Sequence, residues 1–361
     1  MGKCISLTAL QNQRYRHSFG KAGLKSVTTD LGDGTVMHFW IPKSHKPNKP
    51  TLLLIHGIGA NAMWQWNPFI SRFSSKFNVY VPDLLFFGDS YTTLPDRTEA
   101  FQARSIMRAM EAYGVARSML VVGLSYGGFV GYSMAAQFPE AVERLVIGAA
   151  GVCMEEKDME DGLFKVKSID EAATILLPQT PDKMRELVQL TFYKPPKILP
   201  SCVLTDFIRT RIIVAARGGK GTSLVVAVMV TVFGGCGIVA VAVAVPNLFK
   251  PNVMCTEYLE ERKELIQALH KDRKLSDLPS ITQPTFIIWG DQDQIFPVEL
   301  AHRLKRHLGE NAQLLITKNA GHAINMEKTK EWFKPMRSFL IDPLPPKHEN
   351  HGDDGKADEE V

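Results

Sequence analysis

The chain has 361 residues, of which 45% are hydrophobic and 22% charged, as in ordinary globular proteins with a full core. The formal charge of +4 is small, and no basic stripe carries interleaved aromatics, which argues against a nucleic-acid-binding function. Five scattered cysteines form neither a CxxC pair nor a His/Cys cluster, so we expect no metal, no other cofactor and a reducing, cytoplasmic environment.

The N-terminal segment 1–20 lacks the long apolar core of a signal peptide, and we expect it to be flexible. It matches the myristoylation pattern M-G-x-x-x-[ST] through Gly2 and Ser6, and Cys4 is a candidate for a second acyl chain. Basic residues that would face anionic lipid follow at Arg14, Arg16 and Lys21. The pattern is short and also occurs by chance. If it is used, the protein contacts the cytoplasmic face of a membrane peripherally.

A β-hairpin is predicted next, because two alternating runs flank the turn Gly32–Gly34. Short apolar runs then alternate with segments of helical spacing. These runs are Thr51–Gly57, Phe77–Asp83, Ser118–Ser125, Arg144–Ala150, Pro284–Asp293 and Ala312–His322. An amphipathic helix is predicted over Thr329–Leu340. The alternation predicts an α/β fold, with a mostly parallel sheet and helices on both faces, formed by residues 21–152 and 279–341.

The strand pattern stops over residues 153–278, where the spacing is helical. We interpret this region as a helical cap inserted into the core domain. Its apolar residues suit a hydrophobic acyl chain, although the same residues would also pack helices together: Ile175, Leu176, Leu177, Leu190 and Phe192. The polar, acidic tail 342–361 is expected to be disordered.

Residues Gly123–Gly127 form a G-x-S-x-G pattern centred on Ser125, between a predicted strand and a predicted helix. That context is the one that a nucleophile elbow requires, with small residues beside the strained serine. A serine needs a base, and His322 follows the last predicted strand at the same edge of the sheet. An acid must orient that histidine. Asp293 is preferred because it lies farther into its loop, and Asp291 is the alternative.

Acyl transfer also needs hydrogen-bond donors for the developing oxyanion. The loop after His56-Gly57 can direct the Ile58 N–H at the site, and the Tyr126 N–H follows the serine directly. His56 is expected to hold this loop by hydrogen bonds. Trp64 and Trp66 are expected to line the pocket or to pack in the core, and the pattern does not choose between the two.

On these motifs the sequence resembles the α/β-hydrolases of the HGxG…GxSxG type. It is similar to a plant branch related to monoacylglycerol lipases and to carbon–carbon-bond hydrolases of the meta-cleavage kind. The resemblance covers about residues 20–340, apart from one stretch. It implies a serine hydrolase with Ser125, Asp293 and His322 as catalytic residues, and the N–H groups of Ile58 and Tyr126 as oxyanion donors. A cap-shaped apolar pocket is also implied.

The predicted substrate is therefore a small hydrophobic or lipid-like carboxylic ester. Two alternatives remain at this point. One is hydrolysis of a carbon–carbon bond, and the other is a non-catalytic receptor for a small ligand on the same fold. For an esterase, acyl transfer to an acceptor other than water is also open.

Residues Ser223–Val245 form an uncharged apolar run long enough to cross a bilayer. A single crossing would place Ser125 on the opposite side from Asp293 and His322, so we reject it. Gly234–Gly237 divides the run, and its valines favour strands, which predicts a hairpin.

The wider segment 209–252 interrupts the cap with foreign composition. We interpret it as an insertion peculiar to this chain, with translated intron sequence as the hypothesis. A mature transcript that retains these codons would count against that origin.

Overall fold

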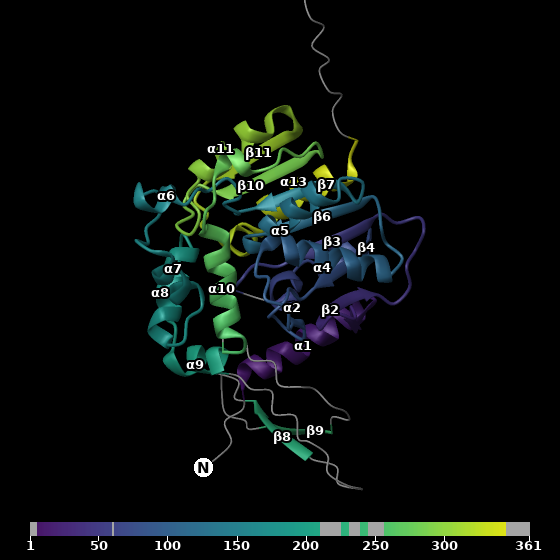
Figure 1. Ribbon diagram of the computed structural model, residues 1–361. Helices are drawn as coiled ribbons and strands as arrows, with labels where there is room; N and C mark the ends of the chain where they lie inside the picture. Colours follow the sequence, from purple (N-terminus) through teal and green to yellow (C-terminus); the bar gives the residue numbers. More distant parts are fainter. Residues whose placement is uncertain (1–5, 60, 210–224, 231–238, 245–255, 344–361) are drawn as a thin grey trace, which may run out of the picture.

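Figure 1 shows the computed structural model of the protein, which describes residues 6–59, 61–209, 225–230, 239–244 and 256–343. The main sheet has nine strands in the order β1-β2-β4-β3-β6-β7-β10-β11, with β5 paired to β2. Its strands are β1 (Leu24–Asp30), β2 (Thr35–Pro42), β3 (Thr51–Ile55), β4 (Asn78–Pro82), β5 (Tyr91–Thr92), β6 (Met119–Leu124), β7 (Val142–Gly148), β10 (Thr285–Gly290) and β11 (Ala312–Thr317). Neighbouring strands from β4 to β11 are parallel, and the pairs of β2 with β1, β4 and β5 are antiparallel. The predicted hairpin and the mostly parallel sheet are both confirmed.

Each face of the sheet has its own apolar core, because successive side chains of a strand point to opposite faces. Leu53 and Ile55 of β3 pack in the core that contains α4, α5 and α11, whereas Leu52 and Leu54 pack with α1, α2, α3 and α13. The helices of the core domain are α1 (Leu7–Lys21), α2 (Ala62–Trp66), α3 (Ile70–Ser74), α4 (Glu99–Ala112), α5 (Tyr126–Gln137), α11 (Glu299–Leu308), α12 (Ile324–Glu327) and α13 (Thr329–Ile341), and a short 3-10 turn spans Gly309–Asn311. Helices therefore cover both faces, as expected for a buried parallel sheet.

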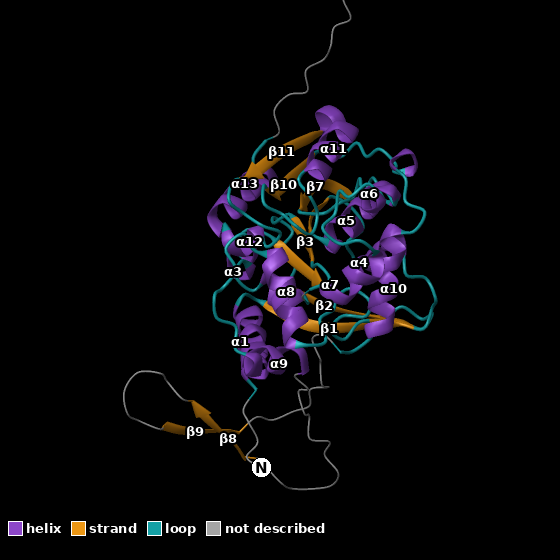
Figure 2. Cartoon of the chain, turned by 90° about the vertical axis from the view of Figure 1, so that its left-hand side faces the viewer, coloured by secondary structure: helices purple, strands orange, loops and turns teal. Residues whose placement is uncertain are grey.

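Between β7 and β10 the chain forms mainly helices, which lie together beside the sheet in Figures 1 and 2. They are α6 (Lys157–Glu160), α7 (Ile169–Leu176), α8 (Pro181–Thr191), α9 (Ser201–Arg209) and α10 (Leu259–His270), followed by a 3-10 turn at Leu275–Asp277. Helix α7 packs against α8 and α10, and α9 packs against α8 and α1. Ser168 and Thr180 cap α7 and α8 through their hydroxyl groups. We refer to these helices as the cap.

The N-terminal segment corrects one of our expectations. Residues 1–20 were expected to be flexible, but α1 begins at Leu7 and packs on the core domain. Ser6 caps the helix by accepting the Ala9 N–H, and Phe19 is fully buried. The Asp206 carboxylate of α9 accepts both the backbone N–H and the hydroxyl group of Thr8. The helix is thus held by tertiary contacts that its polar sequence does not reveal.

The apolar run contains two short strands that pair with each other apart from the main sheet. Strands β8 (Val225–Val230) and β9 (Val239–Ala244) are antiparallel, with Val225 opposite Ala244 and Val230 opposite Val239. The predicted hairpin pairing is confirmed for these strands, while Gly234–Gly237 lies outside the described residues. Within the described ranges, no helix combines the length and the hydropathy needed to span a bilayer.

Three further expectations concern residues outside the described part of the chain. These residues are Gly2, Cys4 and 344–361. Acylation of the N-terminus, the membrane contact that would follow from it, and disorder of the tail therefore stay predictions.

Candidate active site

Ser125 occupies a strained turn between β6 and α5. Its φ is 53° and its ψ is −124°, a conformation that costs a residue with a side chain roughly 1–3 kcal/mol. The Ser125 N–H donates to the carbonyl oxygen of Gly148 at 2.8 Å, and the Gly128 N–H donates to that of Ser125 at 2.8 Å. A Cβ atom on Gly123 would lie 2.1 Å from the carbonyl oxygen of Gly127. The predicted sharp strand–serine–helix turn, with its requirement for small neighbours, is present.

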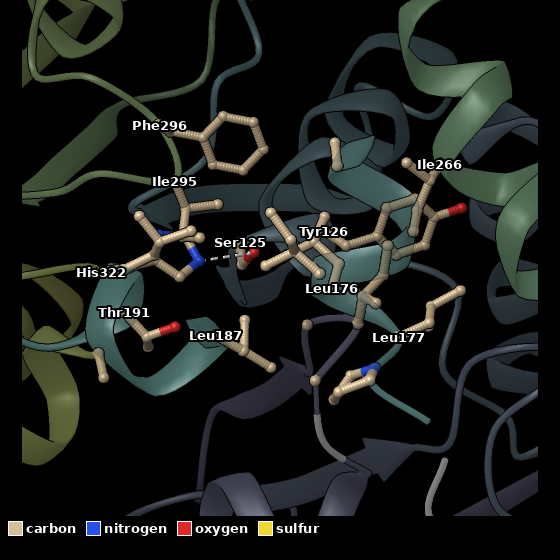
Figure 3. A pocket seen from close by; sticks show the side chains of 18 of the residues that line it. Ser125, Tyr126, Leu176, Leu177, Leu187, Thr191, Ile266, Ile295, Phe296 and His322 are labelled. Carbon is tan, nitrogen blue, oxygen red and sulfur yellow. Dashed lines mark hydrogen bonds between the residues drawn. The ribbon is translucent and has the colours of Figure 1, made fainter. Parts of the chain in front are cut away.

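His322 links Ser125 to Asp293 through one hydrogen bond at each ring nitrogen (Figure 3 shows the bond to Ser125). Nε2 lies 3.0 Å from Ser125 Oγ, and Nδ1 lies 2.9 Å from Asp293 Oδ2. Because a carboxylate only accepts hydrogen bonds, Nδ1 carries the proton and Nε2 is free to accept the serine proton. The structure thus brings together three residues that the sequence places 168 and 29 positions apart (125 to 293, and 293 to 322).

Asp293, rather than Asp291, is the acid that contacts the histidine. Its side chain is fully buried, and its second oxygen, Oδ1, accepts the N–H groups of Ile295 at 2.9 Å and Phe296 at 3.0 Å. Both carboxylate oxygens are therefore engaged by donors, as a buried charge requires. Asp291 instead accepts the Ala320 N–H at 3.3 Å. Its role is to hold the loop that carries His322.

The two predicted oxyanion donors lie beside the serine. Ile58 and Tyr126 line the same cavity as Ser125 and His322. In the described chain, neither backbone N–H donates to another protein group, so both are available to a substrate oxygen. A Cβ atom on Gly57 would lie 3.0 Å from the Cβ of Ser125, which shows how closely this loop approaches Ser125.

His56 holds the loop that follows β3 and carries Ile58, as expected from the sequence. We refer to this loop as the oxyanion loop. Its Nδ1 lies 2.8 Å from the carbonyl oxygen of Gly57, and its Nε2 accepts the Leu84 N–H at 3.0 Å. The Gly57 N–H in turn donates to the Gln65 side chain at 2.9 Å. Because an N–H group can only donate, Nε2 must be unprotonated, and burial lowers the pKa of His56.

This buried neutral histidine predicts pH-dependent stability. The pKa of His56 is lower in the folded chain than in the unfolded chain. The contribution of neutral His56 to the free energy of unfolding is therefore complete above about pH 6.5 and is lost as the pH falls below that value. We expect this one group to lower the unfolding free energy by at most about 1.4 kcal/mol per pH unit there. Urea denaturation at pH 7.5, 6.5 and 5.5 should show a flatter profile for His56→Gln. The exposed control His302→Gln should keep the slope of the wild type; equal slopes for all three proteins would contradict the assignment.

A second Ser–His–Asp group, hydrogen-bonded in the same order, lies in the sheet. It lacks the sharp turn and the cavity that accompany Ser125. Ser26 Oγ lies 2.7 Å from His38 Nε2, and His38 Nδ1 lies 2.8 Å from Asp83 Oδ2. Ser26 is within strand β1 rather than on a sharp turn, and none of the three residues lines the cavity. Asp83 Oδ1 also accepts the Ala62 N–H at 2.9 Å. The group links β1, β2 and the end of β4 to α2, which is a structural role.

Asp83 is held in its charged form by these neighbours. Burial alone would raise its pKa, but the hydrogen bonds with His38 and with the Ala62 N–H, together with electrostatic attraction from the neighbouring histidines, outweigh burial and lower the pKa. A charged Asp83 keeps its acceptor function at both oxygens. It thereby fixes the start of α2, directly after the oxyanion loop.

Ser125 opens into a cavity of about 500 Å³ between the core domain and the cap. All five apolar cap residues singled out in the sequence line it: Ile175, Leu176, Leu177, Leu190 and Phe192. Of the two tryptophans, Trp64 lines the cavity, whereas Trp66 is fully buried and lies against Trp332. In Figure 3, Leu187 and Thr191 lie on the His322 side of Ser125, and Leu176, Leu177 and Ile266 lie on the side of Tyr126.

The wall of the cavity also includes residues that no sequence motif indicated. Tyr15 of α1 lines it and packs edge-on against Trp64, with ring centroids 5.2 Å apart. Arg262 of α10 also lines the wall, with its guanidinium donating to the carbonyl oxygen of Phe86 and stacked on Phe87. No local signal marks these residues, because each reaches the cavity only through the packing of distant elements.

Comparisons with known proteins agree with this architecture. A sequence model described as the alpha/beta hydrolase fold matches residues 50–192 and 256–329, and the unmatched stretch between them contains the predicted insertion 209–252. The chain is 27% identical to Lipase 1 of Psychrobacter immobilis over 91% of this chain and 88% of that protein. It is 24% identical to monoacylglycerol lipase ABHD6 of Homo sapiens over 81% and 76% of the two chains.

Solved structures share the fold at lower identity. The crystal structure of a putative lipase from Acinetobacter baumannii superposes with a TM-score of 0.68 at 21% identity, over 94% of this chain and 97% of that one. The 2-hydroxy-6-oxo-6-phenylhexa-2,4-dienoate hydrolase from Rhodococcus sp. strain RHA1 gives a TM-score of 0.60 at 18% identity, over 89% and 99%. With its family match spanning most of the chain and its serine at the strand–helix turn, this protein belongs to the α/β-hydrolase fold family.

Proposed function

We propose that the protein is a carboxylic ester hydrolase that acts through an acyl-enzyme formed on Ser125. The observation that carries the proposal is the continuous hydrogen-bonded chain from Ser125 through His322 to Asp293, placed at the floor of an apolar cavity. The names of the similar proteins, Lipase 1 and monoacylglycerol lipase, support an ester as the substrate.

In the proposed mechanism each group has one task. His322 Nε2 accepts the serine proton while Ser125 Oγ attacks the ester carbonyl carbon. The carbonyl oxygen becomes negative and receives the N–H groups of Ile58 and Tyr126. His322 then donates the proton to the departing alcohol, which leaves the acyl group on Ser125. Water, deprotonated by the same nitrogen, attacks the acyl-enzyme and releases the acid.

The lining of the cavity supports a hydrophobic ester as the substrate. Side chains of the cap and of the loop after β10 present mainly aliphatic and aromatic surface to Ser125. Transfer of apolar surface out of water contributes roughly 25 cal/mol per Å², so each methylene of a bound chain adds affinity. We therefore propose a hydrophobic acyl ester, lipid-like or small, as the substrate.

A screen of esters tests this function. p-Nitrophenyl esters of rising chain length and monoacylglycerols should be hydrolysed, and Ser125→Ala should lower kcat by about 10⁴-fold or more. A fluorophosphonate probe should label the wild type at Ser125 and leave the variant unlabelled. Full esterase activity in Ser125→Ala would refute the mechanism.

The same screen separates the two alternatives. Turnover of a meta-cleavage dienoate without turnover of any ester would favour carbon–carbon-bond hydrolysis. The structural likeness to the Rhodococcus hydrolase, at 18% identity, concerns the fold and does not itself favour that reaction. A folded protein that turns over none of these compounds and is not labelled by the probe would favour the receptor.

A further inference from the structure

Glu327 ties the loop that carries His322 to the end of cap helix α8. Its Oε2 accepts the Gly321 N–H at 2.7 Å and the Tyr193 N–H at 3.1 Å, and its Oε1 accepts the Lys194 N–H at 3.0 Å. Gly321 is the residue immediately before His322, and Tyr193 and Lys194 follow α8. One carboxylate therefore bridges two segments that are more than 120 residues apart in the sequence.

The residue on the other side of His322 contacts the same end of α8. The Ala323 N–H donates to the carbonyl oxygen of Thr191 at 3.0 Å. Both peptide neighbours of His322 are thus fixed to the stretch 191–194, one directly and one through Glu327. Figure 3 shows Thr191 beside His322 at the edge of the cavity.

The backbone at Gly321 lies so close to the end of α8 that no side chain would fit between them. A Cβ atom on Gly321 would lie 2.5 Å from the carbonyl oxygen of Thr191 and 2.8 Å from the backbone nitrogen of Tyr193. These neighbours are backbone atoms and have no side-chain rotamer to change. A displacement of the end of α8 toward this loop would therefore have to move the backbone at Gly321, next to His322.

We propose that Glu327 is a positioning residue for His322, which it holds at the distance from Ser125 that proton transfer requires, and that it couples the cap to the catalytic histidine. This inference rests on the proposed esterase function. A carboxylate suits the role because hydrogen bonds to an ionised acceptor are roughly twice as strong as neutral ones. Glu327 touches neither Ser125 nor Asp293 in the described contacts, so it acts through the backbone at Gly321.

A residue that positions His322 affects the rate of the chemical step more than the binding of the substrate. A misplacement of about 1 Å at a reacting group costs about 100-fold in rate. A group that acts only in the transition state lowers kcat and kcat/KM equally and leaves KM unchanged. The kinetic signature of Glu327 should therefore appear in kcat.

Three variants test the proposal: Glu327→Ala, Glu327→Gln and the control Glu331→Gln, which changes an exposed glutamate four residues later on α13. Hydrolysis of p-nitrophenyl acetate and p-nitrophenyl laurate would be measured, with kcat normalised to the amount of Ser125 labelled by a fluorophosphonate at completion. We expect Glu327→Ala to lower the normalised kcat by about 100-fold on both esters, with KM changed by less than about threefold.

Glutamine at position 327 should rescue part of this loss. Its amide oxygen can replace Oε2 and keep the bonds to Gly321 and Tyr193, whereas its NH₂ group cannot accept the Lys194 N–H. We expect a loss of about tenfold or less for Glu327→Gln, and none for Glu331→Gln. The glutamine variant also keeps the test valid if the alanine variant does not fold.

Two results would overturn the proposal. An unchanged normalised kcat in both Glu327 variants would show that the residue only stabilises the fold. A loss confined to the laurate ester would show that it holds the cap over the acyl chain without positioning His322. Failure of the probe to label the wild type at Ser125 is a different outcome, which would refute the proposed function itself.

Discussion

Asp293→Asn should lower kcat by about 10⁴-fold while leaving the fold intact. Asp293 Oδ1 accepts two backbone N–H groups, from Ile295 and Phe296, so the oxygen of an asparagine amide will take that position. The NH₂ group must then face His322 Nδ1, where a donor is now met by a donor. The imidazole responds by moving its proton to Nε2, and this tautomer cannot accept the proton of Ser125. Steady-state hydrolysis of a p-nitrophenyl ester, with circular dichroism to verify the fold, measures the effect.

Asp291→Asn is the matched control, since it makes the same chemical change two residues earlier. Asp291 accepts one backbone N–H, from Ala320, and an asparagine oxygen can accept the same bond. We expect its kcat to fall by less than about tenfold. A severe loss in Asp291→Asn together with a mild one in Asp293→Asn would reverse the assignment of the acid.

The three residues of the candidate active site were predictable because each lies in a loop at the end of a strand. Ser125 follows β6, Asp293 lies in the loop after β10, and His322 lies in the loop after β11. The carboxyl ends of parallel strands share one edge of the sheet, so a serine, an acid and a histidine in such loops must lie close together. The sequence favoured Asp293 over Asp291 from its place in the loop, and in the folded chain Asp293 is the one of the two that contacts His322.

The cap contacts were not predictable, because they depend on residues that are distant in sequence and locally unremarkable. Glu327 has no feature that sets it apart from Glu331 in the sequence, yet it meets Tyr193 and Gly321 in the structure. Helix α1 was missed for the same reason. Its buried face includes the polar residues Thr8 and Asn12, whose partners, Asp206 and Trp64, lie far along the chain. Hydrophobic periodicity detects apolar faces and is silent about polar ones.

Gly127→Ala should destabilise the protein by about 3 kcal/mol or more, because it inserts a side-chain atom where the backbone leaves no room. A Cβ atom at this position would lie 2.4 Å from the carbonyl oxygen of Ile55 and 2.7 Å from that of His56. Ile55 ends β3, and His56 follows it at the start of the loop that carries Ile58. Relief of the clash must therefore separate α5 from β3 and move the Ile58 N–H away from Ser125. Urea denaturation and esterase activity should both reveal the damage.

Gly20→Ala separates this steric effect from the general effect of a glycine in a helix. Gly20 lies in α1 with no atom within 4 Å of the Cβ position, so its replacement should stabilise the protein by up to about 1 kcal/mol through helix propensity. Replacement of glycine by alanine should thus lower the free energy of unfolding at position 127 and raise it at position 20. If Gly127→Ala were as stable and active as the wild type, the close contact between the elbow and β3 would not be the feature that fixes the nucleophile.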